Sequence, residues 1–139
     1  MFEFEKVLSD NVSYSVSKVE YTTSSSGNSA TGYKFEDRIS VREKNDKELA
    51  IDFSRRLYLE PERLFDVYIC YNVRWTVKDA DAVQTTDNEE IIRNLVSQKR
   101  GFIDGVIYSR ISLLMSEITS AVGNPPIVTQ PIFVDGDTD

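Results

Sequence analysis

Residues 103–134 decide the fold of this chain, and their sequence is IDGVIYSRISLLMSEITSAVGNPPIVTQPIFV. Apolar residues recur there at spacings of three and four, which predicts one face of a long amphipathic helix made of Ile103, Ile107, Ile111, Leu114, Ile118 and Ala121. A second stripe widens that face and consists of Val106, Leu113 and Val122. Gly123 suits the end of a helix, and Pro125, Pro126 and Pro131 then favour an extended tail. A helix this apolar must lie against a sheet, a partner helix or both.

The composition limits the classes of function that the chain can have. A length of 139 residues suits one domain, and we expect a single domain over residues 1–139 with one core. The formal net charge of -7 argues against nucleic acid or an anionic membrane surface as the main partner, because both attract clustered Lys and Arg. The sequence contains no histidine, the commonest general base and transition-metal ligand.

Three features of the sequence predict a cytoplasmic location. Cys70 is the single cysteine, so an intrachain disulfide is impossible and a reducing compartment fits. The first residues, MFEFEK, lack the basic and then apolar pattern of a signal peptide. No apolar window approaches the ~20 residues that a membrane-spanning helix needs, so we expect no membrane insertion.

The N-terminal third of the chain favours β-strands. Alternation from Phe2 to Val16 predicts a first strand, with a bulge or bend near residues 9–11 because the apolar pattern changes phase there. A second change of phase follows at Val19. The segment 24–32, SSSGNSATG, is predicted to be a flexible loop between two strands.

Three more strands are predicted from the same alternation. The second has an apolar face made of Tyr33, Phe35, Ile39 and Val41. A polar turn at residues 43–47 leads to the third, whose apolar face, interrupted by Arg55, is made of Leu49, Ile51, Phe53, Leu57 and Leu59. We expect Arg55 and Arg56 to lie at a solvated edge, with the binding of an acidic partner as the alternative. The fourth strand, residues 65–77, alternates without a break, which indicates an antiparallel sheet with one covered face.

A short helix is predicted between the sheet and the long helix. Residues 80–86 are expected to form a loop, and Asp87 with Glu90 then matches the spacing of a capping box. Gly101 is expected to end the short helix, and the acidic segment 135–139 is expected to be frayed. The fold class is therefore α+β: a four-stranded antiparallel sheet followed by a short and a long C-terminal helix and an extended tail.

The sequence lacks the common signatures of catalysis and cofactor binding. We find no Cys/His metal set, no nucleophile elbow, no P-loop and no dinucleotide-binding glycine pattern. The paired carboxylates at residues 79/81 and 89/90 are interpreted as a solvated loop and a helix cap, and Cys70 as an inert packed thiol. We therefore predict no enzyme activity, no catalytic residue, no metal and no cofactor.

Two stretches resemble a known family. One runs from Ile111 through Gly123 into the Pro-punctuated hydrophobic tail that ends Pro131-Ile132-Phe133, and the other is the alternating opening from Phe2 to Tyr14. Together with the order of elements, they resemble the SecB-type protein-export chaperones and their SecB-like relatives. The resemblance implies an ATP-independent holdase of the cytoplasm, typically a tetramer built as a dimer of dimers. It also implies a hydrophobic groove that receives unfolded or extended polypeptide.

The chain departs from that family at several positions. Asn11 and Ser15 fall where the family carries acidic side chains that help to engage the SecA translocase motor. The long helix begins with Asp104-Gly105 in place of the usual Pro and is about one turn longer. These departures indicate a divergent SecB-like protein, for which a translocase motor or an antitoxin is a possible partner.

Three hypotheses for function follow. The first is a general holdase for unfolded polypeptide, and the second is a SecB-like adaptor or antitoxin-associated chaperone with one specific partner. The third, a small-molecule binder or hydrolase, would need a closed pocket with convergent polar groups. For the first two we expect a homo-oligomer, a tetramer or a dimer, because the apolar face of the long helix is too wide for one small sheet to cover.

The expected groove lies between the long helix and the sheet, and its candidate residues are Phe65, Phe102, Tyr108 and Met115. Tyr71 and Trp75 are expected to be ordinary core residues. The candidate interface between copies consists of Val12, Tyr14, Val16, Ile107, Ile111, Leu114 and Ile118.

Overall fold

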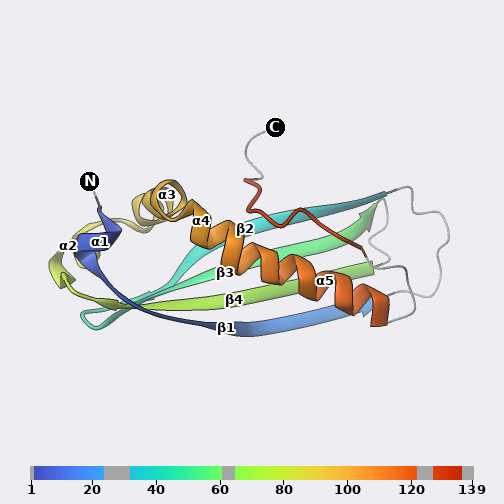
Figure 1. Cartoon of the computed structure of the whole chain (residues 1–139), viewed down its shortest axis with the longest axis horizontal. Helices are drawn as coiled ribbons and strands as arrows, with labels where there is room; N and C mark the ends of the chain where they lie inside the picture. Colours follow the sequence, from blue (N-terminus) through green and yellow to red (C-terminus); the bar gives the residue numbers. More distant parts are fainter. Residues whose placement is uncertain (1, 24–31, 61–64, 122–126, 136–139) are drawn as a thin grey trace.

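The computed structural model describes residues 2–23, 32–60, 65–121 and 127–135. Within these ranges the strands are β1 (Leu8–Thr23), β2 (Gly32–Lys44), β3 (Glu48–Glu60) and β4 (Phe65–Val77). They form one antiparallel sheet in the order β1-β4-β3-β2, so that β1 and β2 are its two edges (Figure 1). The helices are α1 (Phe4–Val7), α2 (Ala80–Thr85), α3 (Asn88–Gln98), α4 (Arg100–Phe102), the π-helical η1 (Ile103–Tyr108) and α5 (Ser109–Ala121).

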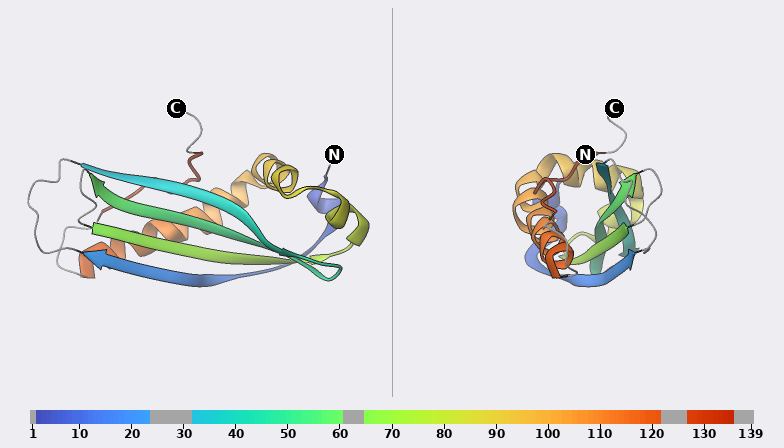
Figure 2. Two further views of the ribbon diagram at one scale, coloured as in Figure 1. Left: turned by 180° about the vertical axis from the view of Figure 1, so that it is seen from behind. Right: turned by 90° about the vertical axis from the view of Figure 1, so that its right-hand side faces the viewer.

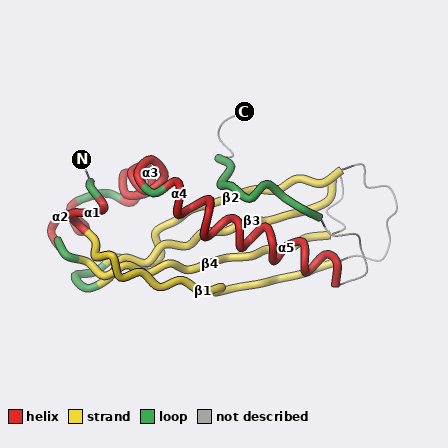
Figure 3. Tube along the Cα trace, viewed as in Figure 1, coloured by secondary structure: helices red, strands yellow, loops and turns green. Residues whose placement is uncertain are grey.

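The helices and the sheet form two layers. α4, η1 and α5 run on as one long helix that crosses one face of the sheet obliquely, as Figures 1 and 2 show. α1, α2 and α3 gather at one end of the sheet, and residues 127–135 form a tail that returns beside the long helix (Figure 3). The architecture is the predicted α+β fold, with strands and helices segregated along the chain.

The core lies between the long helix and the facing side of the sheet. Alternate residues of the two central strands point into it, as a two-residue period requires. From the strands it takes Leu49, Ile51, Phe53, Leu57, Val67, Ile69, Val73 and Trp75. From the helices it takes Phe4, Val7, Val83, Ile91, Leu95, Ile103, Ile107, Tyr108, Ile111 and Met115.

Several local predictions are confirmed. Asn45 closes the β2–β3 hairpin, since its side-chain oxygen accepts hydrogen bonds from the amides of Lys47 and Glu48 at 2.8 and 2.9 Å. The pairing of β1 with β4 shifts between Leu8 and Val12 and again between Val16 and Lys18, where the apolar pattern changes phase. Asp87 caps α3 by accepting from the amide of Glu90 at 2.9 Å.

Two predictions about the segments that precede and follow the sheet are wrong. The segment Phe4–Val7 is one helical turn and not part of the first strand. This turn buries Phe4, whose ring lies 6.1 Å from that of Trp75. The burial of aromatic surface outweighs the local preference for a strand. Residues 80–85 form α2 and not a loop, because Asp79 caps the amide of Ala82 and Val83 is fully buried.

The boundary predicted at Gly101 is also wrong. α3 ends at Gln98, with Lys99 as its cap, and the long helix already begins at Arg100, so Gly101 lies inside α4. The π-helical stretch Ile103–Tyr108 then adds a residue to a turn and rotates the following residues. As a result, both Ile107 and Tyr108 face the core.

Parts of the predicted loop 24–32, the helix end at Gly123 with its two following prolines, and residues 136–139 lie outside the described residues. Of the described helices, none is long and apolar enough to cross a membrane.

Candidate functional site

The long helix has two flanks, and they differ in what covers them. The tail, residues 127–135, lies along one flank, on the side of β2 (Figure 1). On the other flank, edge strand β1 presents side chains toward the helix but is only partly covered by it.

Arg55 is the centre of the tail flank. It lies on β3 directly opposite Asp37 of β2, on the face of the sheet that is covered by the helix. Its Nε and Nη2 atoms donate to the two carboxylate oxygens of Asp37 at 2.6 and 2.8 Å, and neither side chain is exposed. The expectation that Arg55 lies at a solvated edge is therefore wrong. A buried charge on this face is tolerated because a bidentate partner faces it.

The rest of the Arg55 guanidinium holds the tail. Nη1 donates to the hydroxyl of Thr129 at 2.8 Å and to the carbonyl of Gln130, and Nη2 donates to the carbonyl of Ile132 at 2.6 Å. Asp37 in turn accepts from the amide of Val134 at 2.9 Å. The ion pair therefore joins two strands to the tail, and its hydrogen-bonding capacity is largely used.

A second polar pair fixes the end of the tail to the start of the long helix. Asp104 accepts from Arg100 Nε through one oxygen and from the amide of Phe133 through the other, both at 2.8 Å. Arg100 also donates to the carbonyl of Phe133. The Phe133 ring lies 5.5 Å from that of Tyr108 and is buried. This flank of the helix is thus sealed by the chain itself.

Tyr108 links the helix to the sheet beneath the tail. Its hydroxyl donates to the carbonyls of Ser54 at 3.1 Å and Arg38 at 3.3 Å, while its ring lies against Phe53 and Phe133. Burial, together with the nearby Asp37 carboxylate, raises the pKa of this hydroxyl far above its ordinary value. The group therefore stays protonated and acts as a donor.

The β1 flank is apolar and exposed. Of the residues of β1 that face the helix, four are between 36% and 46% exposed, and we call these four the apolar strip: Val12, Tyr14, Val16 and Val19. On the helix, Phe102 approaches the strip, with its ring 6.1 Å from that of Tyr14. Because β1 is an edge strand, the strip combines exposed apolar side chains with an unpaired strand edge in the described part of the chain.

A small hollow lies at the N-terminal end of the strip. Its volume is about 140 Å³, and it is lined by the apolar residues Phe4, Leu8, Val12, Trp75 and Phe102, with Glu5, Ser9, Asp10 and Lys99 as polar lining. The rings of Trp75 and Phe102 lie 6.1 Å apart. The hollow has the size and chemistry to accept one apolar side chain from outside.

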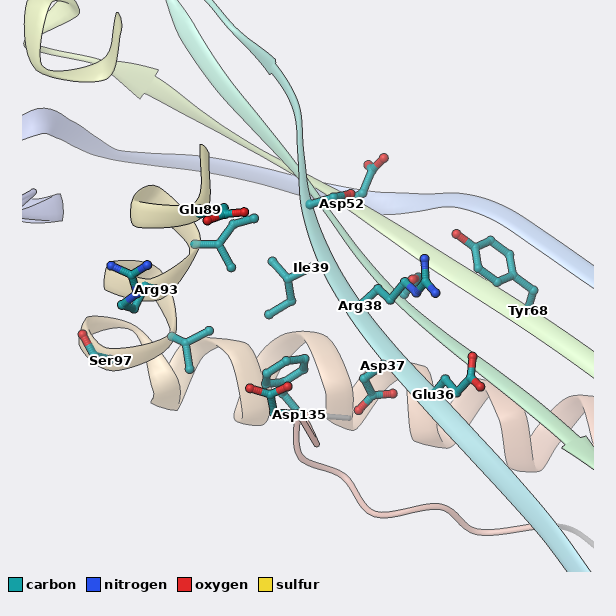
Figure 4. A pocket seen from close by; sticks show the side chains of 15 residues that line it. Glu36, Asp37, Arg38, Ile39, Asp52, Tyr68, Glu89, Arg93, Ser97 and Asp135 are labelled. Atoms are coloured by element: carbon teal, nitrogen blue, oxygen red, sulfur yellow. The ribbon is translucent and has the colours of Figure 1, made fainter. Parts of the chain in front are cut away.

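A much broader concavity, of about 1370 Å³, lies at the other edge of the sheet, between β2 and α3 (Figure 4). Its charged lining carries both signs, with Arg38 and Arg93 among Glu36, Asp52, Glu89 and Asp135. These side chains come from β2, β3, α3 and the tail and spread around the rim in Figure 4. Within the described residues, no group of His, Cys, Asp or Glu is placed to hold a metal ion.

The residues selected from the sequence fall into three groups. Val12, Tyr14 and Val16 are exposed in the strip, and Phe102, Leu114 and Ile118 are partly exposed. Four others are fully buried within the subunit: Ile107, Tyr108, Ile111 and Met115. Phe65 begins β4, and its side chain lies outside what the structure describes. As expected for core residues, Trp75 is buried and Tyr71 is partly buried against the core.

The sequence analysis missed the polar residues that hold the tail. From the sequence, Arg55 was interpreted as an interruption of the apolar face of its strand that lies at a solvated edge. Asp37 is the matching interruption on the preceding strand. Pairing the two strands outward from the turn brings these interruptions to within one residue of each other, and the register shift between Val41 and Glu43 places them opposite. For Arg100 and Asp104, the spacing of four on a helix was the available signal.

Comparison with known proteins supports the fold. No protein-family model matches this chain, and no curated protein matches its sequence. A solved structure of the Mycobacterium tuberculosis Rv1957 SecB-like chaperone, in complex with a ChAD peptide from the Rv1956 HigA1 antitoxin, is similar with a TM-score of 0.57 and 11% sequence identity. The match covers 87% of this chain and 85% of that one. A protein of unknown function from Streptococcus agalactiae matches with a TM-score of 0.42 and 12% identity, over 86% of this chain and 96% of that one. The chain therefore has the fold of a SecB-like chaperone.

Proposed function

We propose that this protein is a SecB-like chaperone that binds unfolded or extended polypeptide without ATP, in the cytoplasm. The single observation that carries the proposal is the apolar strip on edge strand β1, which continues into the small hollow lined by Trp75 and Phe102. Apolar side chains bind non-native chains without demanding a sequence, at about 25 cal/mol per Å² buried before the costs of association. An unpaired strand edge adds main-chain hydrogen bonds that are equally tolerant of sequence.

The type of client is the second part of the proposal. The similar Rv1957 protein is a SecB-like chaperone that was solved with a peptide from an antitoxin. Asn11 and Ser15 lie exposed on β1 and carry no charge, at the positions where the resemblance places the acidic contacts to a translocase motor. This favours an adaptor for an antitoxin-like partner over a protein dedicated to export. A general holdase and a dedicated adaptor predict different ranges of clients.

The third part of the proposal concerns association between copies of the chain. We propose that copies pair through the exposed members of the predicted interface, Val12, Tyr14, Val16, Leu114 and Ile118, to give a dimer or a tetramer. Ile107 and Ile111 contribute only inside the subunit, because both are fully buried there. Because Val12 also lines the small hollow and Tyr14 contacts Phe102, pairing of copies and binding of a client would compete for this part of β1.

The experiment compares two double variants on opposite faces of the same strand. Val12→Asp with Val16→Asp places charges in the strip, whereas Ser13→Asp with Ser15→Asp places the same charges on the other face. We expect the wild-type protein and the serine variant to suppress aggregation of a chemically unfolding test protein without ATP, and the valine variant to lose this activity. Equal activity in both folded variants would contradict the proposal.

A capture experiment separates the two ranges of clients. A general holdase should recover many proteins from a lysate and lose them when unfolded peptides compete. A dedicated adaptor should recover one partner and resist this competition.

A further inference from the structure

We infer that the seat of the tail is itself a polypeptide-binding groove, in which residues 127–135 are the resident occupant. An extended client segment with an aromatic side chain exchanges with the tail. This inference deepens the proposed function and rests on it. It assigns the partner to the tail flank of the long helix, which is distinct from the apolar strip on β1.

The groove recognises the main chain of the tail more than its side chains. Ser112 donates to the carbonyl of Thr129 at 2.7 Å, and Thr119 accepts from the amide of Ile127 at 2.8 Å. Arg55, Arg100, Asp104 and Asp37 engage the further main-chain groups, which are the carbonyls of Gln130, Ile132 and Phe133 and the amides of Phe133 and Val134. Every peptide has these groups, so the same contacts are open to another extended chain.

The tail buries two side chains, the aromatic Phe133 and the small polar Thr129, and leaves others exposed. Phe133 is buried against Tyr108, with the Arg100 guanidinium 5.5 Å from its ring centre. By contrast, Val128 is 70% exposed and Ile132 is 41% exposed. A groove that buries only one aromatic and one small polar side chain of the described tail residues, and leaves several others in solvent, selects weakly for sequence. That is the property expected of a site for varied extended segments.

The groove opens toward the broad concavity beside α3. Asp135 pairs with Asp37 as a parallel β-bridge, so the tail begins to add a strand to the β2 edge. In Figure 4, Asp135 and Asp37 are among the residues that line this concavity, and Arg38 and Ile39 follow Asp37 along β2. A segment that replaces the tail in the same direction can continue along this edge, beside Ile39 and Ser40.

The test weakens the occupant while leaving the groove intact. Phe133→Ala removes the anchor of the tail, and Val128→Ala is the matched control on the same tail. The probe is a fluorescein-labelled peptide, IVTQPIFVD, which copies residues 127–135. We expect the folded F133A chain to bind this peptide about tenfold more tightly than the wild-type or V128A chains, because less of the groove is then occupied in cis. The same peptide with alanine in place of phenylalanine should not bind.

A second measurement uses the wild-type chain in case F133A does not fold. Hydrogen exchange of the Phe133 and Val134 amides is followed with and without a reduced, alkylated and therefore permanently unfolded protein. We expect the unfolded protein to speed exchange at these two amides, while the Lys78 amide, which donates to the carbonyl of Val7, stays unchanged.

The outcomes separate this inference from the proposed function. If the wild-type chain suppresses aggregation but its Phe133 and Val134 amides do not respond to the client, the inference is overturned and the proposed function stands. Failure of a folded F133A chain to bind the peptide has the same meaning. If aggregation is not suppressed but F133A still captures the peptide, the proposed holdase activity fails while the groove remains a polypeptide site.

Discussion

The two flanks of the long helix differ in how far the rest of the chain covers them. On the β2 side, buried Arg55 and Asp37 hold the tail over the helix through hydrogen bonds in defined directions. On the β1 side, the apolar strip stays exposed, although Arg110 and Phe102 of the long helix contact Tyr14. While the tail is in place, the sealed flank contributes to the stability of the subunit, whereas the open flank is exposed to other copies of the chain even then. Substitutions on the two flanks should therefore separate stability from association.

The largest effect is expected on the sealed flank, from Arg55→Ala. This change leaves Asp37 as an unpaired buried charge and releases the tail, and we expect it to lower the free energy of unfolding by about 3–5 kcal/mol. Arg42→Ala is the control, since Arg42 pairs with Asp52 where the arginine side chain is 52% exposed. That change should cost no more than about 1 kcal/mol. Urea unfolding measures the free energy of unfolding of both variants. Equal losses would contradict the view that the Arg55–Asp37 pair is structural and the Arg42–Asp52 pair is not.

A smaller loss is expected from Asp104→Asn, which weakens the contact with Arg100 and the amide of Phe133. We expect a cost of about 1–2 kcal/mol, because a charge-assisted hydrogen bond becomes a neutral one. Exchange of the Phe133 amide should speed up in this variant. Glu117→Gln, at an exposed position of the same helix, should leave both quantities unchanged.

Tyr108 should give the sealed flank a dependence on alkaline pH. Its pKa is raised in the folded chain by burial, so above about pH 10 the unfolded chain loses this proton while the folded chain keeps it. The contribution of Tyr108 to stability is thus complete below that pH and falls as the pH rises. Tyr108→Phe should cost about 1 kcal/mol at neutral pH and show a shallower decline in alkali. Urea titrations between pH 7 and 11 test this, and parallel declines in both proteins would contradict it.

The smallest effect on stability is expected on the open flank, from Val16→Asp. Val16 is 46% exposed, so the cost in free energy of unfolding should be below about 1 kcal/mol. The mass of the native protein in solution should nevertheless fall toward that of one chain. Ser15→Asp, on the other face of β1, should keep the larger mass. If Val16→Asp destabilised the subunit as much as Arg55→Ala, the open flank would belong to the folding core.

Much of the fold was predictable because local periodicity reports which side of an element is buried. The unbroken alternation of residues 65–77 predicted the central strand β4, and the spacing of Ile103, Ile107 and Ile111 predicted the helix that packs on it. Three of the four residues of the strip, Val12, Tyr14 and Val16, were also selected from the sequence, whereas Val19 was noted only as a change of phase. Periodicity could not show that the π-helical turn would rotate Tyr108 into the core.

The sequence by itself determined the order of the elements, the antiparallel sheet and an apolar face on the long helix, because these depend on residues that are close along the chain. Only the tertiary structure decided which flank of that face is sealed. Arg55 lies 18 residues from Asp37 and 77 from Ile132, and nothing local distinguishes it from a surface arginine. A buried charge is stable only where its partners converge in space, and that convergence is a property of the folded chain.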